Sequence, residues 1–308
     1  MEQSRISITK DMVTLLDESE KDNQFIAVQA TTFAQDVWRR FRRNKIAVFG
    51  LICVAIITIF AIFGPMFCRF SYDEVDLQAV NQTPTFKHWF GTDTLGRDLF
   101  VRVMFGARIS LTVGVAATII NLIVGTIYGG IAGYCGGKID MVMMRIVDII
   151  YSIPTLLYVI LVMMFLGSTL KSVIIAIVIS SWAGMARTVR AEVLKLRQQE
   201  FAVAARVIGA GNRRILVNHL LMNAMGPILV TATLNIPSAI FTEAFLSFVG
   251  VGISVPMASW GTLANDALQT MFQYPYQLFF PVAAICITMF SLNFIGDGLS
   301  DAFDPKRK

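Results

Sequence analysis

Five long stretches of the chain contain no Asp, Glu, Lys or Arg. They are residues 46–68, 109–137, 149–170, 215–242 and 267–296. Each is longer than the roughly 20 residues that a helix needs to cross the hydrocarbon core of a bilayer. A soluble domain can bury one such helix, but five would leave too little polar surface to keep the chain in solution. The sequence therefore predicts an integral membrane protein.

The composition excludes several other classes of protein. Hydrophobic residues make up 55% of the chain and charged residues only 15%, whereas about 25% of an ordinary soluble domain is charged. The net charge of +5 does not imply a nucleic-acid partner, because cytoplasmic loops of membrane proteins are basic. The four cysteines have no metal-binding spacing. We therefore expect no metal and no cofactor.

A sixth, weaker span completes the prediction of an all-α protein with six transmembrane helices. Residues 172–186 are uncharged, and the apolar segment reaches a spanning length if it starts at Gly167 and Lys171 extends to the interface. These runs are too long for the strands of a membrane barrel. The expected spans are residues 46–67, 107–133, 143–166, 168–187, 224–247 and 278–298.

Basic residues predict the orientation of these spans. With the N-terminus inside, the inner segments hold eight, two, seven and three Lys and Arg residues, which is 20 of the 26 in the chain. Because cytoplasmic loops carry the basic excess, both termini are expected in the cytoplasm. The same topology predicts a polar tail (1–32), an interfacial amphipathic helix (33–45), a six-span domain (46–300) and a C-terminal tail (301–308). Its main loops are 68–106 and 251–277 outside and 187–223 inside.

The two outer loops carry candidate sites for an outside partner. The first contains the aromatic and turn-forming run from His88 to Asp98, and the second is nearly uncharged and starts a helix at Ser259, expected to run through Met271. These residues either dock a partner or cap the helix bundle, and the sequence favours neither. The docking candidates are Trp89, Asp93, Arg97, Asp98, Trp260 and Asp266.

Prolines and acids inside the spans are candidates for the transport path. Pro154 and Pro237 each remove a backbone hydrogen bond and should bend a span. Asp148 and Glu243 are costly within a membrane, so each either contacts a substrate or pairs with a basic residue of the bundle, such as Arg145 for Asp148. Glycines at four-residue spacing in the second span, and serines 180 and 181, are assigned to helix packing.

The inner segment 187–223 has a helical pattern of its own. Glu200 suits the first turn of a short helix, and Gly209 is placed to end it. Asn212 is expected to cap the helix that follows. An apolar stripe on the short helix fits either a partner's groove or the chain itself, and the pattern alone does not decide. The stripe consists of Phe201, Ala204, Ala205 and Ile208, with Arg206 beside it.

This segment resembles the EAA motif of ATP-binding-cassette (ABC) importer membrane subunits, with Ala204-Ala205, then Gly209, then His219-Leu220-Leu221. Further motifs occur in order along the chain, on both sides of this segment. With them, the chain from about residue 33 to 308 is similar to the C-type permease of dipeptide and oligopeptide importers. They are FGTD (90–93), LGRD (95–98), GARISL (106–111), EAFLSFVGVG (243–252), SWG (259–261), NFIGDGL (293–299) and DAFDP (301–305). Two departures from the family pattern are Val203, where the motif has glutamate, and Met222, where proline is usual.

The resemblance implies a type I ABC importer permease in a bacterial or archaeal plasma membrane. The short helix would be the coupling helix that docks on an ATPase subunit, through Glu200, Phe201, Ala204, Ala205, Arg206, Ile208 and Gly209. The implied partners are a second related permease chain, two ATPase subunits, an extracytoplasmic peptide-binding protein and the lipid bilayer. No GxxxxGK[ST] loop is present, so ATP would bind another chain, and the protein is not expected to be an enzyme.

Other readings remain open on the sequence alone. Relatives of this family also carry nickel complexes, glutathione or murein peptides. An ion-coupled secondary transporter would use buried acids and commonly shows internal repeats, which are not evident here. An intramembrane enzyme is a further alternative, but no catalytic constellation supports it, because His88 and His219 are predicted on opposite sides of the membrane.

Overall fold

The computed structural model describes residues 32–253 and 257–304. Contacts divide the chain into two units, 1–36 and 37–308. In the first unit only residues 32–36 are described, and they include the start of the first helix. The predicted polar tail (1–32), apart from Thr32, lies outside the described residues, as do Pro305, the last residue of the DAFDP motif, and residues 306–308.

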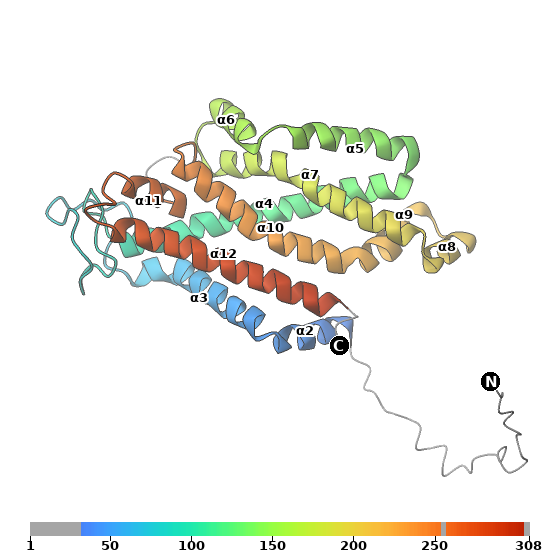
Figure 1. Ribbon diagram of the computed structural model, residues 1–308, viewed down its shortest axis with the longest axis horizontal. Coiled ribbons are helices and arrows are strands. Elements are labelled where there is room, and N and C mark those ends of the chain that lie inside the picture. Colours follow the sequence, from blue (N-terminus) through green and yellow to red (C-terminus); the bar gives the residue numbers. More distant parts are fainter. Residues whose placement is uncertain (1–31, 254–256, 305–308) are drawn as a thin grey trace, which may run out of the picture. The chain divides into compact units, whose positions relative to one another are not determined.

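Within the described residues the secondary structure is helical, apart from one isolated bridge between Thr92 and Asp98 (Figure 1). The all-α prediction is therefore confirmed. The elements are α2 (Phe33–Arg43), α3 (Lys45–Phe67), α4 (Leu99–Cys135), α5 (Gly137–Ser152), α6 (Thr155–Leu166), α7 (Leu170–Arg197), α8 (Glu200–Val207), α9 (Asn212–Arg214), the π-helix η3 (Ile215–Leu221), α10 (Met222–Phe248), α11 (Trp260–Ala267) and α12 (Tyr276–Phe303).

Five described helical segments are long and apolar enough to cross a membrane, and α5 with α6 makes a sixth if the bent pair is one span. The break lies at Pro154, which has no N–H to continue the helix. The two helices meet there at 82°. The proline predicted to bend the third span therefore interrupts it completely.

Helix bounds differ from the expected spans where polar residues are buried by the protein itself. Helix α4 starts at Leu99, inside the stretch expected to be loop, and the Asp98 carboxylate caps it by accepting a hydrogen bond from the Val101 N–H at 2.9 Å. Helix α7 continues beyond the expected membrane span, which ends at residue 187, to Arg197, as the helical spacing of Arg190, Leu194 and Arg197 predicts. These extensions carry two helices of the membrane domain out into the segments that were expected to bear function.

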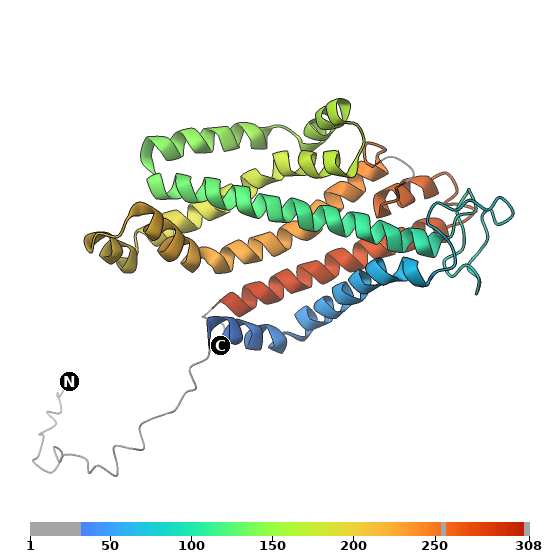
Figure 2. The same ribbon diagram turned by 180° about the vertical axis from the view of Figure 1, so that it is seen from behind.

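Helices α4 and α7 lie side by side along most of their length (Figures 1 and 2). A Cβ atom at Gly129 would lie 2.2 Å from the backbone oxygen of Ala186, and one at Gly125 would lie 2.6 Å from the Met185 Cβ. Only glycine allows the two backbones to approach so closely, as in other small-residue contacts between membrane helices. The packing interpretation of this stripe is confirmed.

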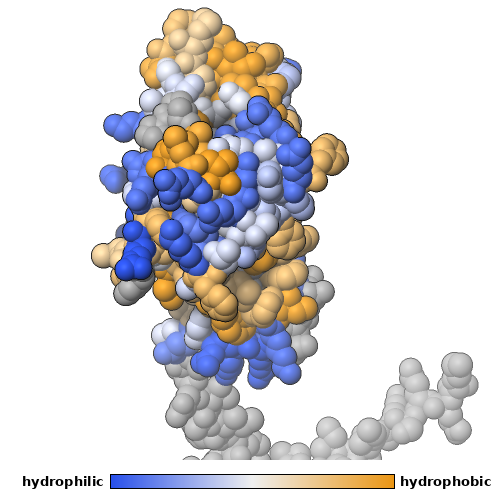
Figure 3. Space-filling model, turned by 90° about the vertical axis from the view of Figure 1, so that its left-hand side faces the viewer, coloured by the Kyte–Doolittle hydropathy of each residue, from blue (hydrophilic) through white to orange (hydrophobic). Residues whose placement is uncertain are grey.

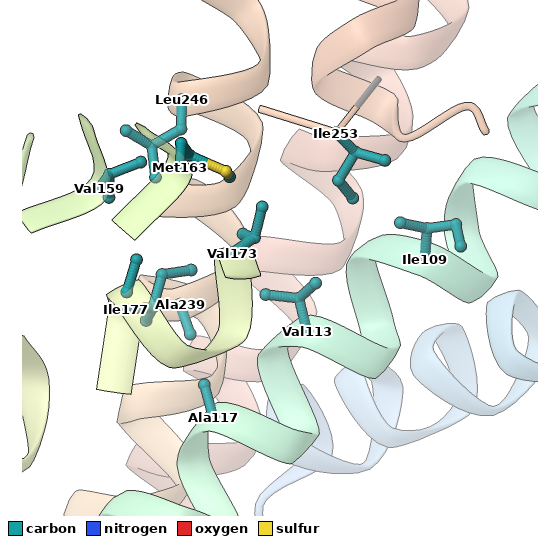
Figure 4. Packing of buried hydrophobic residues seen from close by; sticks show 11 residues of the cluster. Ile109, Val113, Ala117, Val159, Met163, Val173, Ile177, Ala239, Leu246 and Ile253 are labelled. Atoms are coloured by element: carbon teal, nitrogen blue, oxygen red, sulfur yellow. The ribbon is translucent and has the colours of Figure 1, made fainter. Parts of the chain in front are cut away.

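Helix α10 packs on the same pair from another side. A buried apolar cluster brings together side chains of α4, α6, α7 and α10, which point toward one another in Figure 4. Its central members are Val113 from α4, Val159 from α6 and Val173 from α7, none of which is exposed. Dispersion contacts of this kind replace the hydrophobic effect as the main force between helices in lipid. The cluster holds the broken span α5–α6 to the continuous helices.

Helix α3 closes the bundle beside α4 and α12. Pro65 lies inside α3 and offers no N–H to the carbonyl of Ala61. Arg108 of α4 donates to that carbonyl through Nε and to the Ile62 carbonyl through an η nitrogen. The arginine of the GARISL motif therefore donates hydrogen bonds to backbone carbonyls at the outer end of α3. Such carbonyls are costly to leave unpaired in a membrane.

The amphipathic helix α2 leads into α3 at Asn44, whose side chain accepts from the N–H groups of Ile46 and Ala47. Phe41 is buried against Ala47 and Ala302 rather than facing lipid, so it departs from the predicted interfacial face. Trp38 remains half exposed, as expected for that face.

The α4–α7 contact generates a stability prediction. Replacing Gly129 by Ala should push the two backbones apart and cost about 1–3 kcal/mol, which should lower the melting temperature of the detergent-purified protein by ~3 °C or more. The matched control is Gly130→Ala, because a Cβ at Gly130 meets only the Leu221 and Leu216 side-chain tips at ordinary contact distances. Equal melting temperatures for the two variants would contradict the close-packing role.

Candidate functional site

Helix α8 lies at the inner end of the bundle, the end predicted to be cytoplasmic. It begins at Glu200 and ends at Val207, as the sequence predicts. Gly209 follows with a φ of 83°, a left-handed conformation that favours glycine. The Ala210 N–H donates to the Ala205 carbonyl at 3.0 Å and closes the turn. Space around Gly209 is open, so its constraint comes from backbone conformation and not from bulk.

The faces of α8 differ from the predicted stripe. Ala202 and Ala205 are buried and pack in a cluster with Ile215 and Leu220 of η3. Ala205 therefore belongs to the inward face, and the prediction that it contacts a partner is wrong for this structure. A charge at Ala205 would disturb the chain's own packing before it disturbed any docking.

The outward face of α8 is apolar and exposed. Val207 is 81% exposed and Ile208 83% exposed, and Phe201 and Ala204 are also accessible. Val207 was missed in the sequence because it lies outside the i, i+3, i+4, i+7 pattern. Large apolar residues at such exposure on a water-facing segment mark an interaction surface. We call Phe201, Ala204, Val207 and Ile208 the α8 face.

Polar contacts hold α8 and its flanking turns to α4. Arg197, at the end of α7, donates to the carbonyl of Tyr134 at 2.7 Å. The Tyr134 hydroxyl donates to Oδ1 of Asn212 at 2.7 Å. Asn212 is the first residue of α9 and Gly211 is its N-cap, so the predicted capping role of Asn212 is wrong and its side chain instead anchors the segment. Arg190 and Asp140 add an ion pair at 2.5 Å between α7 and α5.

A polar cavity of about 250 Å³ lies within the membrane-spanning region. None of its lining residues is charged. They come from α4, α5, α6, α7 and α10 and are Asn121, Tyr151, Thr155, Ile177, Ser180, Ser181, Gly184, Asn235, Ser238, Ala239 and Thr242. Hydroxyl and amide groups in a membrane interior are costly against lipid, so this cavity is a candidate path for a polar substrate.

Asn121 is the most informative residue of this cavity. It is 2% exposed, and its Nδ2 donates to the Ser181 hydroxyl at 2.7 Å. Its Oδ1 atom has no hydrogen-bond partner among the described residues. A buried amide oxygen without a donor is costly, and because this atom is closed off from solvent, the cost falls on the packing of the cavity wall.

The predicted path prolines flank this cavity without lining it. Tyr151 and Thr155 lie on either side of the break at Pro154, and Asn235 and Ser238 lie on either side of Pro237. The third span is broken at Pro154, whereas α10 continues through Pro237. The sequence prediction missed the neutral polar side chains, and it assigned Ser180 and Ser181 to packing alone.

The two acids predicted for the path are engaged elsewhere. Asp148 pairs with Arg187 at 2.6 Å, not with Arg145, and both side chains of the pair are well exposed. Glu243 is fully buried and accepts hydrogen bonds from Ser110 at 2.7 Å and Ser247 at 2.9 Å. Neither acid lines the polar cavity. Glu243 therefore fixes α10 against α4.

At the outer end, Asp93 is the centre of an ionic network. Its carboxylate accepts from the backbone N–H groups of Leu95 and Arg97 at 2.9 Å each. It also pairs with the Arg97 guanidinium at 2.7 Å and with Arg102 of α4. Asp266 of α11 joins at 3.5 Å from Arg102 and 3.7 Å from Arg97. The network ties the first outer loop to α4 and α11, and Arg102 is a member that the sequence did not single out.

Most predicted docking residues are internal. Asp93, Asp98 and Trp260 are buried; the Trp260 indole donates to the Val103 carbonyl at 3.0 Å, and Asp98 bonds to His88 at 2.8 Å. Only Trp89 and Asp266 present substantial surface. Figure 3 shows hydrophilic residues gathered across the middle of this end, with hydrophobic regions above and below. The capping alternative therefore holds for the buried residues.

The family of the chain follows from comparison with known proteins. Residues 125–308 match the family described as "Binding-protein-dependent transport system inner membrane component". Residues 32–84 match "N-terminal TM domain of oligopeptide transport permease C". The chain belongs to the family of inner-membrane components of binding-protein-dependent transport systems. It is thus a multi-pass inner-membrane permease subunit of an ABC importer, which works with ATPase subunits and a binding protein, and it is not itself an enzyme.

Several relatives match over nearly the whole chain. The oligopeptide transport system permease protein OppC of Bacillus subtilis is 49% identical, covering 97% of this chain and 98% of the relative. The dipeptide transport system permease protein DppC of the same organism is 44% identical, covering 97% of this chain and 94% of the relative. Escherichia coli OppC is 44% identical over 96% and 98%.

A solved structure shows the same fold. A chain of the MetNI methionine ABC transporter, determined in inward-facing conformations, is similar with a TM-score of 0.55 at 19% identity. The match covers 65% of this chain and 93% of that chain. The predicted type I importer permease fold is therefore confirmed.

Proposed function

We propose that the chain forms half of the translocation path of an importer for oligopeptides or dipeptides. A second, related permease chain would supply the other half, with two ATPase subunits inside and a peptide-binding protein outside. The similarity to OppC and DppC permeases over nearly the whole chain carries this proposal. The same similarity does not favour nickel complexes, glutathione, murein peptides or ion-coupled secondary transport.

The polar cavity supports a peptide substrate. A peptide backbone offers N–H donors and C=O acceptors at every residue, whatever its side chains, and neutral amides and hydroxyls can bind both. A lining without charges does not select for or against charged side chains. Asn235, Ser180 and Ser238 bring such groups to the lining.

The α8 face is proposed as the contact with an ATPase subunit. Its exposed apolar residues suit a groove in a partner, and its inward face and the Tyr134–Asn212 contact join it to the bundle. A rigid displacement of the partner on ATP binding would then move α8 and the attached spans together. Glu200 and Arg206 flank this surface as candidate polar contacts.

A charge on the α8 face should uncouple transport. Ile208→Glu should leave membrane insertion unchanged but lower ATP-dependent peptide uptake by about tenfold or more, the effect of ~1.4 kcal/mol, because the acid would be desolvated in the partner's groove. Uptake of labelled peptide in cells lacking the native chain measures this. The matched control is Val203→Glu, which adds the same charge to the same helix at the position where the family motif has glutamate, and it should retain uptake. Full uptake by Ile208→Glu would contradict the docking assignment.

Filling the cavity should slow translocation without uncoupling the ATPase subunits. Ser180→Leu adds apolar bulk to the cavity, and we expect uptake to fall about tenfold, as for ~1.4 kcal/mol on the barrier. Thr58→Leu is the control, since Thr58 also donates its hydroxyl to a carbonyl of its own helix but lies on α3. Stimulation of ATP hydrolysis by the loaded binding protein should persist in both variants. Equal uptake by the two variants would contradict the assignment of the polar cavity to the translocation path.

A further inference from the structure

A separate pocket of about 450 Å³ lies between the outer part of α3, the start of α4 and the first outer loop. It shares no lining residue with the polar cavity and plays no part in the coupling segment. Ile59, Phe60 and Phe63 of α3 and Phe100 and Val101 of α4 form its apolar wall. Because α3 ends at Phe67, this wall lies at membrane depth.

Two cations line the same pocket beyond the end of α3. Arg69 and Lys87 belong to the outer loop, and neither forms an ion pair with another described residue. The ammonium of Lys87 lies 5.6 Å from the centre of the Phe70 ring. Two positive charges that pair with no carboxylate of the described residues thus lie just outside the apolar wall, where lipid phosphates are found.

The acid that lines the pocket does not neutralise these cations. Asp98 is buried; one of its oxygens bonds to His88 at 2.8 Å, and the other accepts from the Val101 N–H at 2.9 Å. Burial, together with the charge of Asp98, raises the pKa of the neighbouring Cys68 thiol, so Cys68 adds no negative charge near neutral pH. The pocket therefore presents a net positive region to an incoming ligand.

The rim of the pocket is aromatic and open. Phe86 is fully exposed and Trp89 is more than half exposed, and both line the pocket. Aromatic residues are enriched at the membrane–water interface, where one part of the ring contacts acyl chains and another contacts headgroups. Their position agrees with a pocket that opens at the level of the lipid headgroups.

We propose that this pocket binds one anionic phospholipid of the outer leaflet. An acyl chain lies against Ile59, Phe60 and Phe63, and the phosphate-bearing headgroup lies beside Arg69 and Lys87. Charge complementarity selects this occupant. A zwitterionic lipid would bring its own cation next to two unpaired cations, and an apolar surface of another protein would bury them without a counter-charge.

Native mass spectrometry of the assembled transporter, stripped of lipid in detergent, tests the proposal. Added phosphatidylglycerol should bind at least about fivefold more tightly than phosphatidylcholine, because each basic residue near an anionic headgroup contributes at about that level. Glycerol 3-phosphate, which has the phosphate without acyl chains, should not bind measurably. Equal binding of the two lipids, or tight binding of glycerol 3-phosphate, would overturn the proposal.

Charge-matched variants locate the site. Arg69→Gln and Lys87→Gln should each reduce the preference for phosphatidylglycerol several-fold, whereas Lys171→Gln, which removes an exposed cation predicted to lie on the same side, should retain it. Ile59→Trp should fill the pocket beside its apolar wall and weaken the binding of both lipids without changing the ratio of their affinities. An unchanged preference in both the Arg69 and the Lys87 variant would contradict the site, even if the wild-type transporter prefers anionic lipid.

Discussion

The contact between the backbones of α4 and α7 is the constraint on which the rest of the structure depends. At Gly129 the backbone of α4 meets the backbone of Ala186 directly, and at Gly125 it meets the Cβ of Met185. The backbone of each helix is internally hydrogen-bonded, as lipid demands. In a bilayer, where apolar side chains gain nothing by leaving lipid, such close packing is a main source of helix association. The pair thus forms the rigid unit to which α5, α6 and α10 are attached.

Both functional regions take their geometry from this pair. Asn121 of α4 and Ser181 of α7 face each other across a hydrogen bond in the polar cavity. At the inner end, Arg197 of α7 binds the end of α4, and Tyr134 of α4 binds Asn212 beyond α8. The proposed coupling surface is therefore connected to the proposed path through short, directional contacts rather than through a flexible loop.

The sequence predicted what depends on composition and periodicity, and it failed where tertiary contacts decide. Charge-free runs predicted the spans, and Glu200 and Gly209 predicted the bounds of α8. The direction in which Ala205 faces could not be predicted. Any amphipathic helix buries its apolar face, and the pattern does not say whether it packs on its own chain or on a partner. Asp93 and Trp260 were indistinguishable from docking residues, since their partners Arg102 and Val103 become neighbours only in the folded chain. The neutral cavity residues gave no signal, because serine and asparagine are also ordinary packing residues in membrane helices.

In the proposed coupling, α8 and the α4–α7 pair move as one body. The most direct test is a double electron–electron resonance distance between spin labels at Val203→Cys on α8 and Ile123→Cys on α4, in a chain whose four native cysteines are replaced. Both positions are exposed, and the assembled transporter is measured without nucleotide and with ATP bound to the ATPase subunits. If they move as one body, the mean distance is the same in both states. A shift of more than one helical turn, about 5.4 Å, would show that α8 moves independently of the pair and would contradict the proposed coupling.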